Sequence, residues 1–128
     1  MTSDTDGILV IEDDVDILRA IVQVLEDEGH AVRGAANGHV ALELLRQPRG
    51  QRPRLILLDL MMPVMDGWAF RAEQLRDPAL AAIPVIVLTA DGSAEEKGQL
   101  MKCAGALRKP VALTDLLTAV EPYLATTR

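Results

Sequence analysis

Three short runs of Val, Ile and Leu, at residues 8–11, 55–58 and 85–88, contain no polar residue. Runs of this length that do not alternate with polar positions are typical of parallel β-strands covered on both faces. Two weaker segments, residues 31–35 and 106–108, complete a predicted set of five strands, with 31–35 nearer an edge of the sheet.

Helical patterns fill the intervals between these strands. Apolar residues at spacings of three and four predict a first helix from about Ile17, with Gly29 as its left-handed terminator. A second helix opens at Asn37 and ends before Pro48, and a third runs from about residue 68 to 76.

Two further helices are predicted after the run at 85–88. Ser93 caps the fourth, with acidic residues in its first turn, and Gly105 ends it. The last helix carries one apolar stripe, formed by Leu113, Leu116, Leu117, Val120 and Leu124. The β-α order, repeated five times, predicts an α/β fold: a doubly wound three-layer sandwich around a five-stranded parallel sheet.

Composition agrees with a single globular domain over residues 1–128, in which residues 1–6 form a polar N-terminal extension. No apolar run approaches the roughly 20 residues of a membrane span, and the acidic start is no signal peptide, so we expect a cytoplasmic protein without membrane contact. The net charge of −6 disfavours direct nucleic-acid binding. Cys103 is the only cysteine and is predicted to be a small buried residue.

Reactive side chains follow four of the predicted strands. Glu12 and Asp13 follow the first run, Asp59 the run at 55–58, Thr89 the run at 85–88, and Lys109 the last strand. Alone, each has an ordinary interpretation, such as a helix cap, a strand-end hydroxyl or a surface charge. Because the carboxyl ends of parallel strands share one edge of a sheet, we expect these groups to meet there.

Such a cluster suits phosphoryl chemistry. A carboxylate can attack phosphorus and form an acyl phosphate. Donor and nucleophile are both anionic, so a hard divalent cation is needed, and Glu12 and Asp13 can supply oxygen ligands together with Asp59. Lys109 offers a positive charge, and Thr89 a hydroxyl, to phosphoryl oxygens.

Residues 8–14, 57–67 and 83–90, together with Lys109-Pro110, resemble the two-component response-regulator receiver domain. We expect a stand-alone receiver. The resemblance covers essentially the whole chain. It implies a chemotaxis-regulator-like fold with the flavodoxin-like strand order 2-1-3-4-5. It also implies a phospho-switch that takes a phosphoryl group on Asp59 from a histidine kinase or a histidine phosphotransfer protein.

By the same resemblance, Mg²⁺, with Mn²⁺ as the alternative ion, is bound by Asp13, Asp59 and the Met61 backbone carbonyl, with Glu12 acting through water. Thr89 is the switch hydroxyl. The output is a changed affinity for a protein partner that the sequence does not name. Self-phosphorylation and slow self-dephosphorylation are then its only reactions, so we do not expect an enzyme with a separate substrate.

The remaining family assignments concern Lys109 and the residues beside the acids. The resemblance pairs Lys109 with the phosphoryl group and makes the Lys109-Pro110 peptide bond cis, a form that proline readily permits. Asp14 is expected to start the first helix.

The sequence departs from the family at Ala106, where members usually carry Tyr or Phe. Alanine has no rotamer to switch, so either another side chain fills the gap or the output runs through the loops beside Thr89 and Asp59. Three further positions, Met61, Ala90 and Asp91, should modulate the lifetime and accessibility of the phosphoryl group. Met61 cannot hydrogen-bond an attacking water, so we predict slow hydrolysis that Met61→Asn accelerates.

Alternatives remain. One is a degraded receiver that only binds partners. The intact set of Glu12, Asp13, Asp59, Thr89 and Lys109 argues against it. An aspartyl phosphatase would need a second acid two residues after Asp59, where Met61 stands. The chain could also be a receiver excised from a larger response regulator or hybrid histidine kinase. Trp68 either packs on the third helix or contacts a partner.

Overall fold

The computed structural model describes residues 7–47, 52–60, 65–90, 96, 99 and 102–124. Five parallel strands form one sheet in the order β2-β1-β3-β4-β5. They are β1 (Ile8–Ile11), β2 (Val32–Ala35), β3 (Leu55–Asp59), β4 (Val85–Thr89) and β5 (Gly105–Arg108). The sequence-based fold class and the order 2-1-3-4-5 are therefore confirmed.

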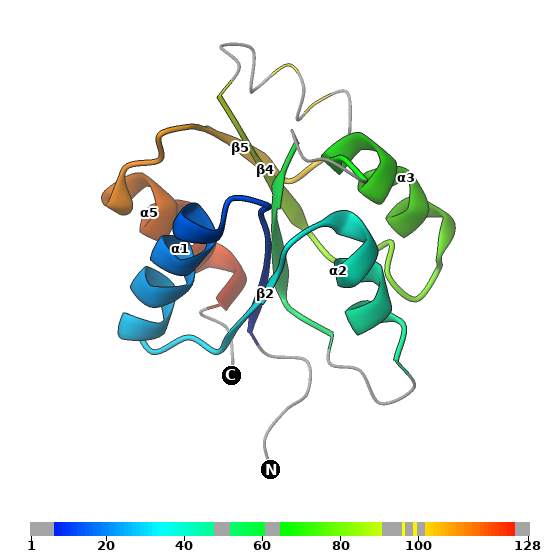
Figure 1. Cartoon of the computed structure of the whole chain (residues 1–128), viewed down its shortest axis with the longest axis horizontal. Helices are drawn as coiled ribbons and strands as arrows, with labels where there is room; N and C mark the ends of the chain where they lie inside the picture. Colours follow the sequence, from blue (N-terminus) through cyan, green and yellow to red (C-terminus); the bar gives the residue numbers. More distant parts are fainter. Residues whose placement is uncertain are drawn as a thin grey trace.

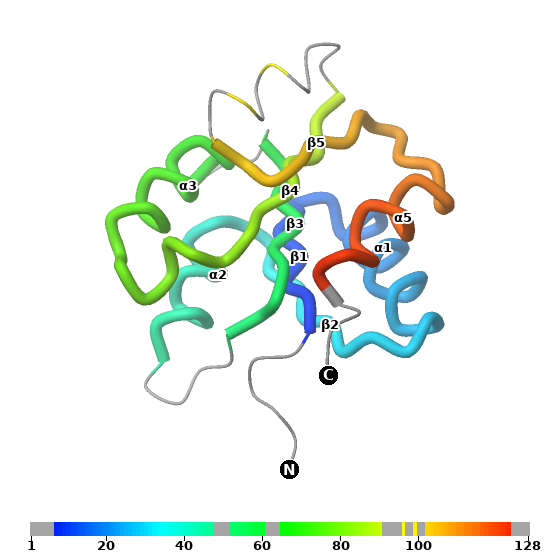
Figure 2. Tube along the Cα trace, turned by 180° about the vertical axis from the view of Figure 1, so that it is seen from behind, coloured from blue at the N-terminus to red at the C-terminus, as the bar shows by residue number. Residues whose placement is uncertain are grey.

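Four helices are described: α1 (Val15–Asp27), α2 (Gly38–Leu45), α3 (Gly67–Arg76) and α5 (Leu113–Leu124). Helices α1 and α5 cover one face of the sheet and α2 and α3 the other (Figure 1). The view from behind shows the same three layers (Figure 2). Among these helices, none has the length and apolarity needed to cross a bilayer.

Alternate side chains of the central strands enter two separate cores. In β1, Leu9 and Ile11 pack in the cluster under α2 and α3, whereas Ile8 and Val10 pack in the cluster under α1 and α5. All residues of β1, β3 and β4 are buried. This explains why their sequences read as uninterrupted apolar runs, because a strand covered on both faces has no solvent-facing side.

The helix ends follow the predicted signals. Asp14 caps α1, its carboxylate accepting hydrogen bonds from the backbone N–H groups of Asp16 (2.9 Å) and Ile17 (3.1 Å). Asn37 caps α2 in the same way through the Val40 N–H, at 2.9 Å. Gly29 follows α1 with a φ of +93°, a left-handed conformation that favours glycine.

Three sequence-based expectations about the C-terminal half need correction or lie outside the described residues. Gly105 opens β5 instead of ending a helix, and the left-handed residue before β5 is Lys102, with a φ of +58°. The predicted cap Ser93, and most of the fourth helix, fall outside the described residues. Leu113 is 52% exposed because it is the first residue of α5, ahead of the buried Leu116 and Val120.

Helix α3 buries polar side chains that sequence reasoning missed. The Arg71 guanidinium donates to the Gln74 side-chain oxygen at 2.6 Å and to the Lys102 carbonyl at 2.7 Å. The Gln74 amide donates to the carbonyls of Leu80 (2.9 Å) and Ile83 (3.0 Å). These bonds tie α3 to the turn that follows it and to the segment that leads into β5.

Candidate functional site

The candidate site lies at the edge of the sheet where the strands end. Asp59, the last residue of β3, is only 2% exposed, and Thr89, the last residue of β4, is also buried. Glu12 and Asp13 directly follow β1, and Lys109 directly follows β5. The parallel register places these strand ends beside one another, as the sequence predicts.

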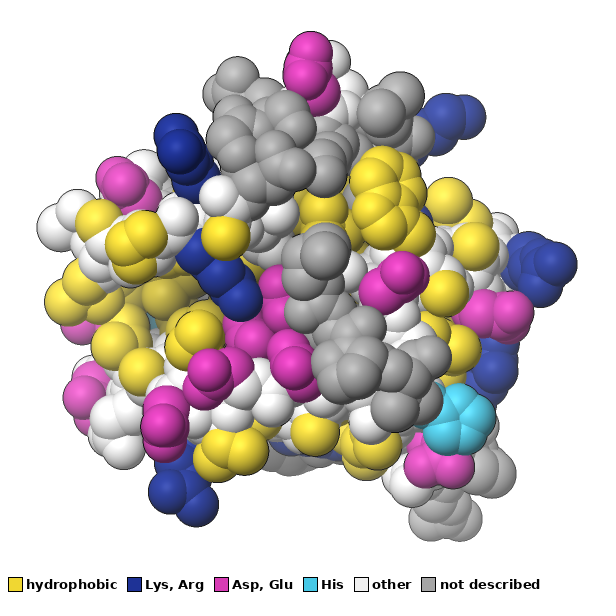
Figure 3. Space-filling view, turned by 45° about the horizontal axis from the view of Figure 1, so that its top comes forward, with side chains coloured by type: hydrophobic (Ala, Val, Ile, Leu, Met, Phe, Trp, Pro, Cys, Tyr) yellow, Lys and Arg dark blue, Asp and Glu magenta, His cyan; other side chains and the backbone are white. Residues whose placement is uncertain are grey.

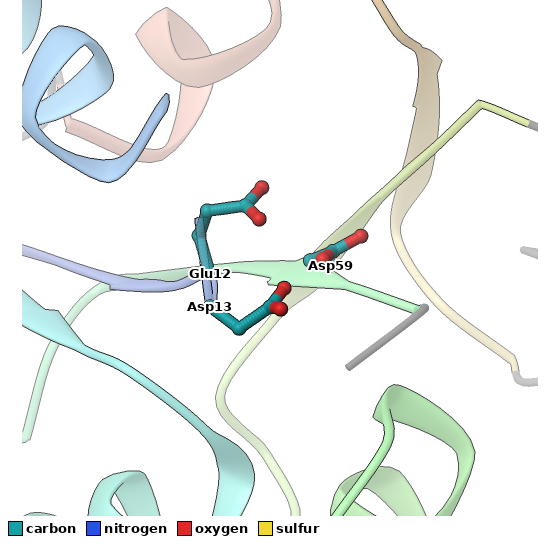
Figure 4. Close-up of side chains that lie close together, drawn as sticks. All are labelled: Glu12, Asp13 and Asp59. Atoms are coloured by element: carbon teal, nitrogen blue, oxygen red, sulfur yellow. The ribbon is translucent and has the colours of Figure 1, made fainter. Parts of the chain in front are cut away.

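The three acidic side chains point toward a common space (Figure 4). Glu12, Asp13 and Asp59 each offer a carboxylate oxygen, and these oxygens lie within 4.8 Å of one another. Acidic side chains are also gathered at the centre of this face in the space-filling view (Figure 3). Three converging carboxylates are hard oxygen donors and fit a hard divalent cation such as Mg²⁺. The further predicted ligand, the Met61 carbonyl, lies outside the described residues.

Lys109 links the end of β5 to residues that follow or end β1 and β3. Its Nζ lies 2.7 Å from Oε1 of Glu12 and 3.2 Å from Oδ1 of Asp59. Its backbone N–H donates to the Thr89 carbonyl at 2.8 Å, so the end of β4 fixes the base of the lysine. The Lys109-Pro110 peptide bond is cis, in agreement with the resemblance.

Glu12 serves two neighbours at once. One carboxylate oxygen bonds the Lys109 ammonium, and the other accepts from the Asp14 backbone N–H at 3.2 Å. The sequence suggested only a water-mediated metal role for Glu12. The direct bond to Lys109 is an additional contact, made across 97 positions of sequence.

Burial and charge perturb the titration of the site. Burial, and next the Glu12 charge, raise the pKa of Asp59 from 3.8 to about 6, although Lys109 opposes the rise. Burial lowers the pKa of Lys109, but its hydrogen bond to Glu12 and the charge of Asp59 outweigh that effect and raise it above the ordinary value. The cluster of three carboxylates contains one ammonium, which contacts Glu12 and Asp59, so the cluster favours an added positive charge.

Helix α3 begins against the end of the Asp59 strand. The Gly67 N–H donates to the Leu60 carbonyl at 3.0 Å. A Cβ atom at Gly67 would lie 2.8 Å from both the Asp59 carbonyl oxygen and the Leu60 Cα, closer than side chains tolerate. Asp66 caps the helix by accepting from the Ala69 N–H at 2.9 Å. Glycine thus permits α3 to start directly beside the acidic cluster.

The predicted modulating residues differ in their placement. Ala90 is exposed beside Thr89. Ala106 is half-buried in β5 opposite Val87, at the margin of the core under α2 and α3, and Cys103 packs at the same margin. Met61 and Asp91 lie outside the described residues.

The single tryptophan and the single cysteine differ in their exposure to solvent. Trp68 is 40% exposed, so its ring is only partly packed against the rest of the protein. Cys103 is only half-buried, and burial raises the pKa of its thiol despite the opposing charge of Arg71. This suits a small packing residue better than a reactive thiolate.

Comparison with known proteins places the chain in a family. The family description "Response regulator receiver domain" matches residues 8–121. Protein PilH of Pseudomonas aeruginosa is 31% identical over 120 residues, which cover 92% of this chain and 97% of PilH. The probable transcriptional regulator ycf29 of Pyropia yezoensis is 37% identical over 120 residues, 92% of this chain but only 53% of that protein. The chain therefore spans about half the length of the first curated relatives it matches.

Solved structures agree with this assignment. The chemotaxis response regulator CheY4 of Vibrio cholerae superposes with a TM-score of 0.81 at 29% identity, covering 96% of this chain and all of that chain. The sequence motifs, the strand order and the acidic cluster with its lysine lead to one conclusion: the chain belongs to the response regulator receiver domain family, which acts in two-component signalling.

Proposed function

We propose that the protein is a phospho-switch in which Asp59 accepts a phosphoryl group from a phosphohistidine of a histidine kinase or histidine phosphotransfer protein. The observation that carries this proposal is the environment of the Asp59 carboxylate. It is buried, shares a space with two further carboxylates, and has an ammonium 3.2 Å away. A strand-end carboxylate that served only as a cap would need none of these groups.

Charge balance supports a divalent cation in the resting site. Mg²⁺, or Mn²⁺ in its place, would be held by Asp13 and Asp59, with Glu12 acting through water. When bound, the cation neutralises the carboxylates and polarises the incoming phosphoryl group. Burial and the Glu12 charge raise the pKa of Asp59, and a bound cation would relieve this electrostatic cost.

The chain's own residues would then direct the transfer. An ionised Asp59 oxygen forms a bond to phosphorus while the phosphorus–nitrogen bond of the phosphohistidine breaks. The electron pair of the broken bond returns to the imidazole nitrogen. Lys109 moves from the Asp59 carboxylate to a phosphoryl oxygen, and the Thr89 hydroxyl donates to another. Positioning and electrostatic stabilisation supply the catalysis, without an external base. No separate substrate is turned over.

The output is proposed to be a changed affinity for a protein partner. Ala106 provides no aromatic rotamer, so the change is expected at the loops beside Thr89 and Asp59 or through a side chain that fills the space. The longer relatives include transcriptional regulators, so a receiver that is part of a larger regulator is the alternative context.

The test is phosphorylation in vitro. The protein is incubated with acetyl phosphate or phosphoramidate and Mg²⁺, and its intact mass is measured. One phosphoryl adduct is expected on the wild type, none on Asp59→Asn, and little when EDTA replaces Mg²⁺.

A matched control is Asp14→Asn, which changes a neighbouring carboxylate but keeps a good helix cap. It should retain the adduct. A wild type without an adduct, or an equal adduct on Asp59→Asn, would refute the proposed acceptor and favour a receiver that only binds partners.

A further inference from the structure

Helix α3 buries polar side chains beside Phe70 and leaves other apolar side chains exposed. Its buried face contains Arg71 and Gln74, which are 7% and 0% exposed. Its outer face carries Trp68 and Leu75, which are 40% and 44% exposed, with the small exposed residues Ala69 and Ala72 between them. We call Trp68, Ala69, Ala72 and Leu75 the α3 stripe. A surface helix normally turns its apolar side inward, so this stripe requires an explanation.

The orientation of α3 is fixed by specific bonds. Arg71 reaches the Lys102 carbonyl, and Gln74 donates to two carbonyls of the following turn. Phe70 fills the core from the same face. Rotating the helix to bury the stripe would break these bonds and leave buried polar groups unpaired. The stripe is therefore held outward by the fold.

The stripe matches itself in an antiparallel arrangement. Trp68 and Leu75 are seven residues apart, two helical turns, so they lie on one side of the helix. A two-fold axis midway between them, close to Ala72, would set each Trp68 against Leu75 of a second copy. The alanines at the centre are small enough for two helices to approach closely. The large–small–large order is the same in both directions.

Charges at the two ends of α3 favour the same arrangement. Asp66 is exposed at the N-terminal end and Arg76 at the C-terminal end. An antiparallel pair brings each Arg76 near Asp66 and the Trp68 ring of the other copy, where an ion pair and a cation–π contact can form. Among the residues that the structure describes, Arg76 forms an exposed ion pair with Glu73 at 3.1 Å, a kind of contact that is readily exchanged.

We propose that the α3 stripe is a docking surface for a second copy of this chain, forming a two-fold dimer through antiparallel α3 helices. This goes beyond the proposed phospho-switch and does not depend on it. One helix face is smaller than the roughly 800 Å² per partner of a standard interface, so the dimer is weak. A dissociation constant on the order of 100 μM is expected.

The first test is sedimentation velocity of the intact chain from about 10 μM to about 1 mM. Leu75→Lys should raise the dissociation constant at least about tenfold, because it removes the apolar side chain that packs against the Trp68 ring of the second copy. Leu113→Lys is the matched control, because Leu113 is a similarly exposed leucine that starts a different helix. It should leave the constant unchanged.

A second variant tests the symmetry. Ala72→Glu places two like charges across the proposed axis and should also weaken the dimer at least about tenfold. In a Cys103→Ala background, Ala72→Cys should form a disulfide-linked dimer on mild oxidation, and Leu113→Cys should not. Trp68, the only tryptophan, should become less accessible to acrylamide as the protein concentration rises.

The proposal is overturned if the wild type stays monomeric at about 1 mM, above the expected constant. It is also overturned if Leu75→Lys and Leu113→Lys have equal effects, or if Ala72→Cys does not cross-link. A monomer whose stripe instead binds an amphipathic helical peptide would assign the surface to a different protein. Melting curves of the variants confirm that each result comes from folded protein.

Discussion

Removing the Asp59 charge should stabilise the metal-free protein at neutral and alkaline pH. Its pKa of about 6 in the folded protein lies above the ordinary value of 3.8, so the folded state binds this proton more tightly than the unfolded chain. The stability that this proton supplies is fully present below pH 3.8 and is lost as the pH rises through 6. The ionised carboxylate therefore destabilises the folded state at pH 8.

The size of the effect follows from the two pKa values. A tenfold change in proton affinity corresponds to about 1.4 kcal/mol. Raising the pKa from 3.8 to about 6 therefore costs the ionised form about 3 kcal/mol. For a chain of this length, that difference corresponds to a shift of about 10 °C in the melting temperature.

The assay is urea unfolding of wild type and Asp59→Asn in EDTA at several pH values, followed by circular dichroism. The variant should be more stable than the wild type at pH 8 by about 3 kcal/mol, and the difference should vanish near pH 4. Saturating Mg²⁺ should stabilise the wild type and do much less for the variant. A difference that is constant with pH, or a variant that is less stable at pH 8, would refute this account of the cluster.

Three further substitutions test other parts of the structure. Gln74→Met removes a buried side chain that donates to the Leu80 and Ile83 carbonyls and accepts from Arg71, so it should lower the free energy of unfolding by about 2–3 kcal/mol in urea. Gln23→Met, at an exposed position, should change it by less than about 0.5 kcal/mol. Gly67→Ala should destabilise the protein by at least about 2 kcal/mol and slow adduct formation measured by intact mass, because its Cβ would meet backbone 2.8 Å away. Gly105→Ala, whose Cβ would find an ordinary 3.5 Å contact, should do neither. Lys109→Met leaves the acids without their ammonium, so it should destabilise the metal-free protein by about 2 kcal/mol or more, as measured by thermal melting. Mg²⁺ should then stabilise this variant more than it stabilises the wild type.

The sheet and the acidic site were predictable because their signals are local. A strand buried on both faces reads as an apolar run, and the residue that ends the run is fixed to the edge of the sheet. Asp59 could be assigned to the site for this reason, and so could Glu12 and Asp13. Caps such as Asp14 also depend only on neighbouring residues.

Helix α3 was predictable in extent but not in orientation. Its periodicity gives no indication that Arg71 and Gln74 face inward, because their partners are carbonyls supplied by other segments. Lys102 is 31 positions from Arg71, and Ile83 is nine from Gln74. The exposure of Trp68 follows from the same bonds. The contact between Lys109 and Glu12 could likewise not be predicted from the sequence, because it depends on how far each side chain extends across the edge of the sheet.

The bond between Lys109 and Glu12 also determines when the site can first exist. Its partners come from opposite ends of the chain, separated by 97 positions. A growing or truncated polypeptide that has not yet added β5 could bring together the acids but would lack the ammonium that balances them. The three carboxylates and the ammonium come together only after the sheet is complete. A chain that lacks β5 therefore cannot form the whole site.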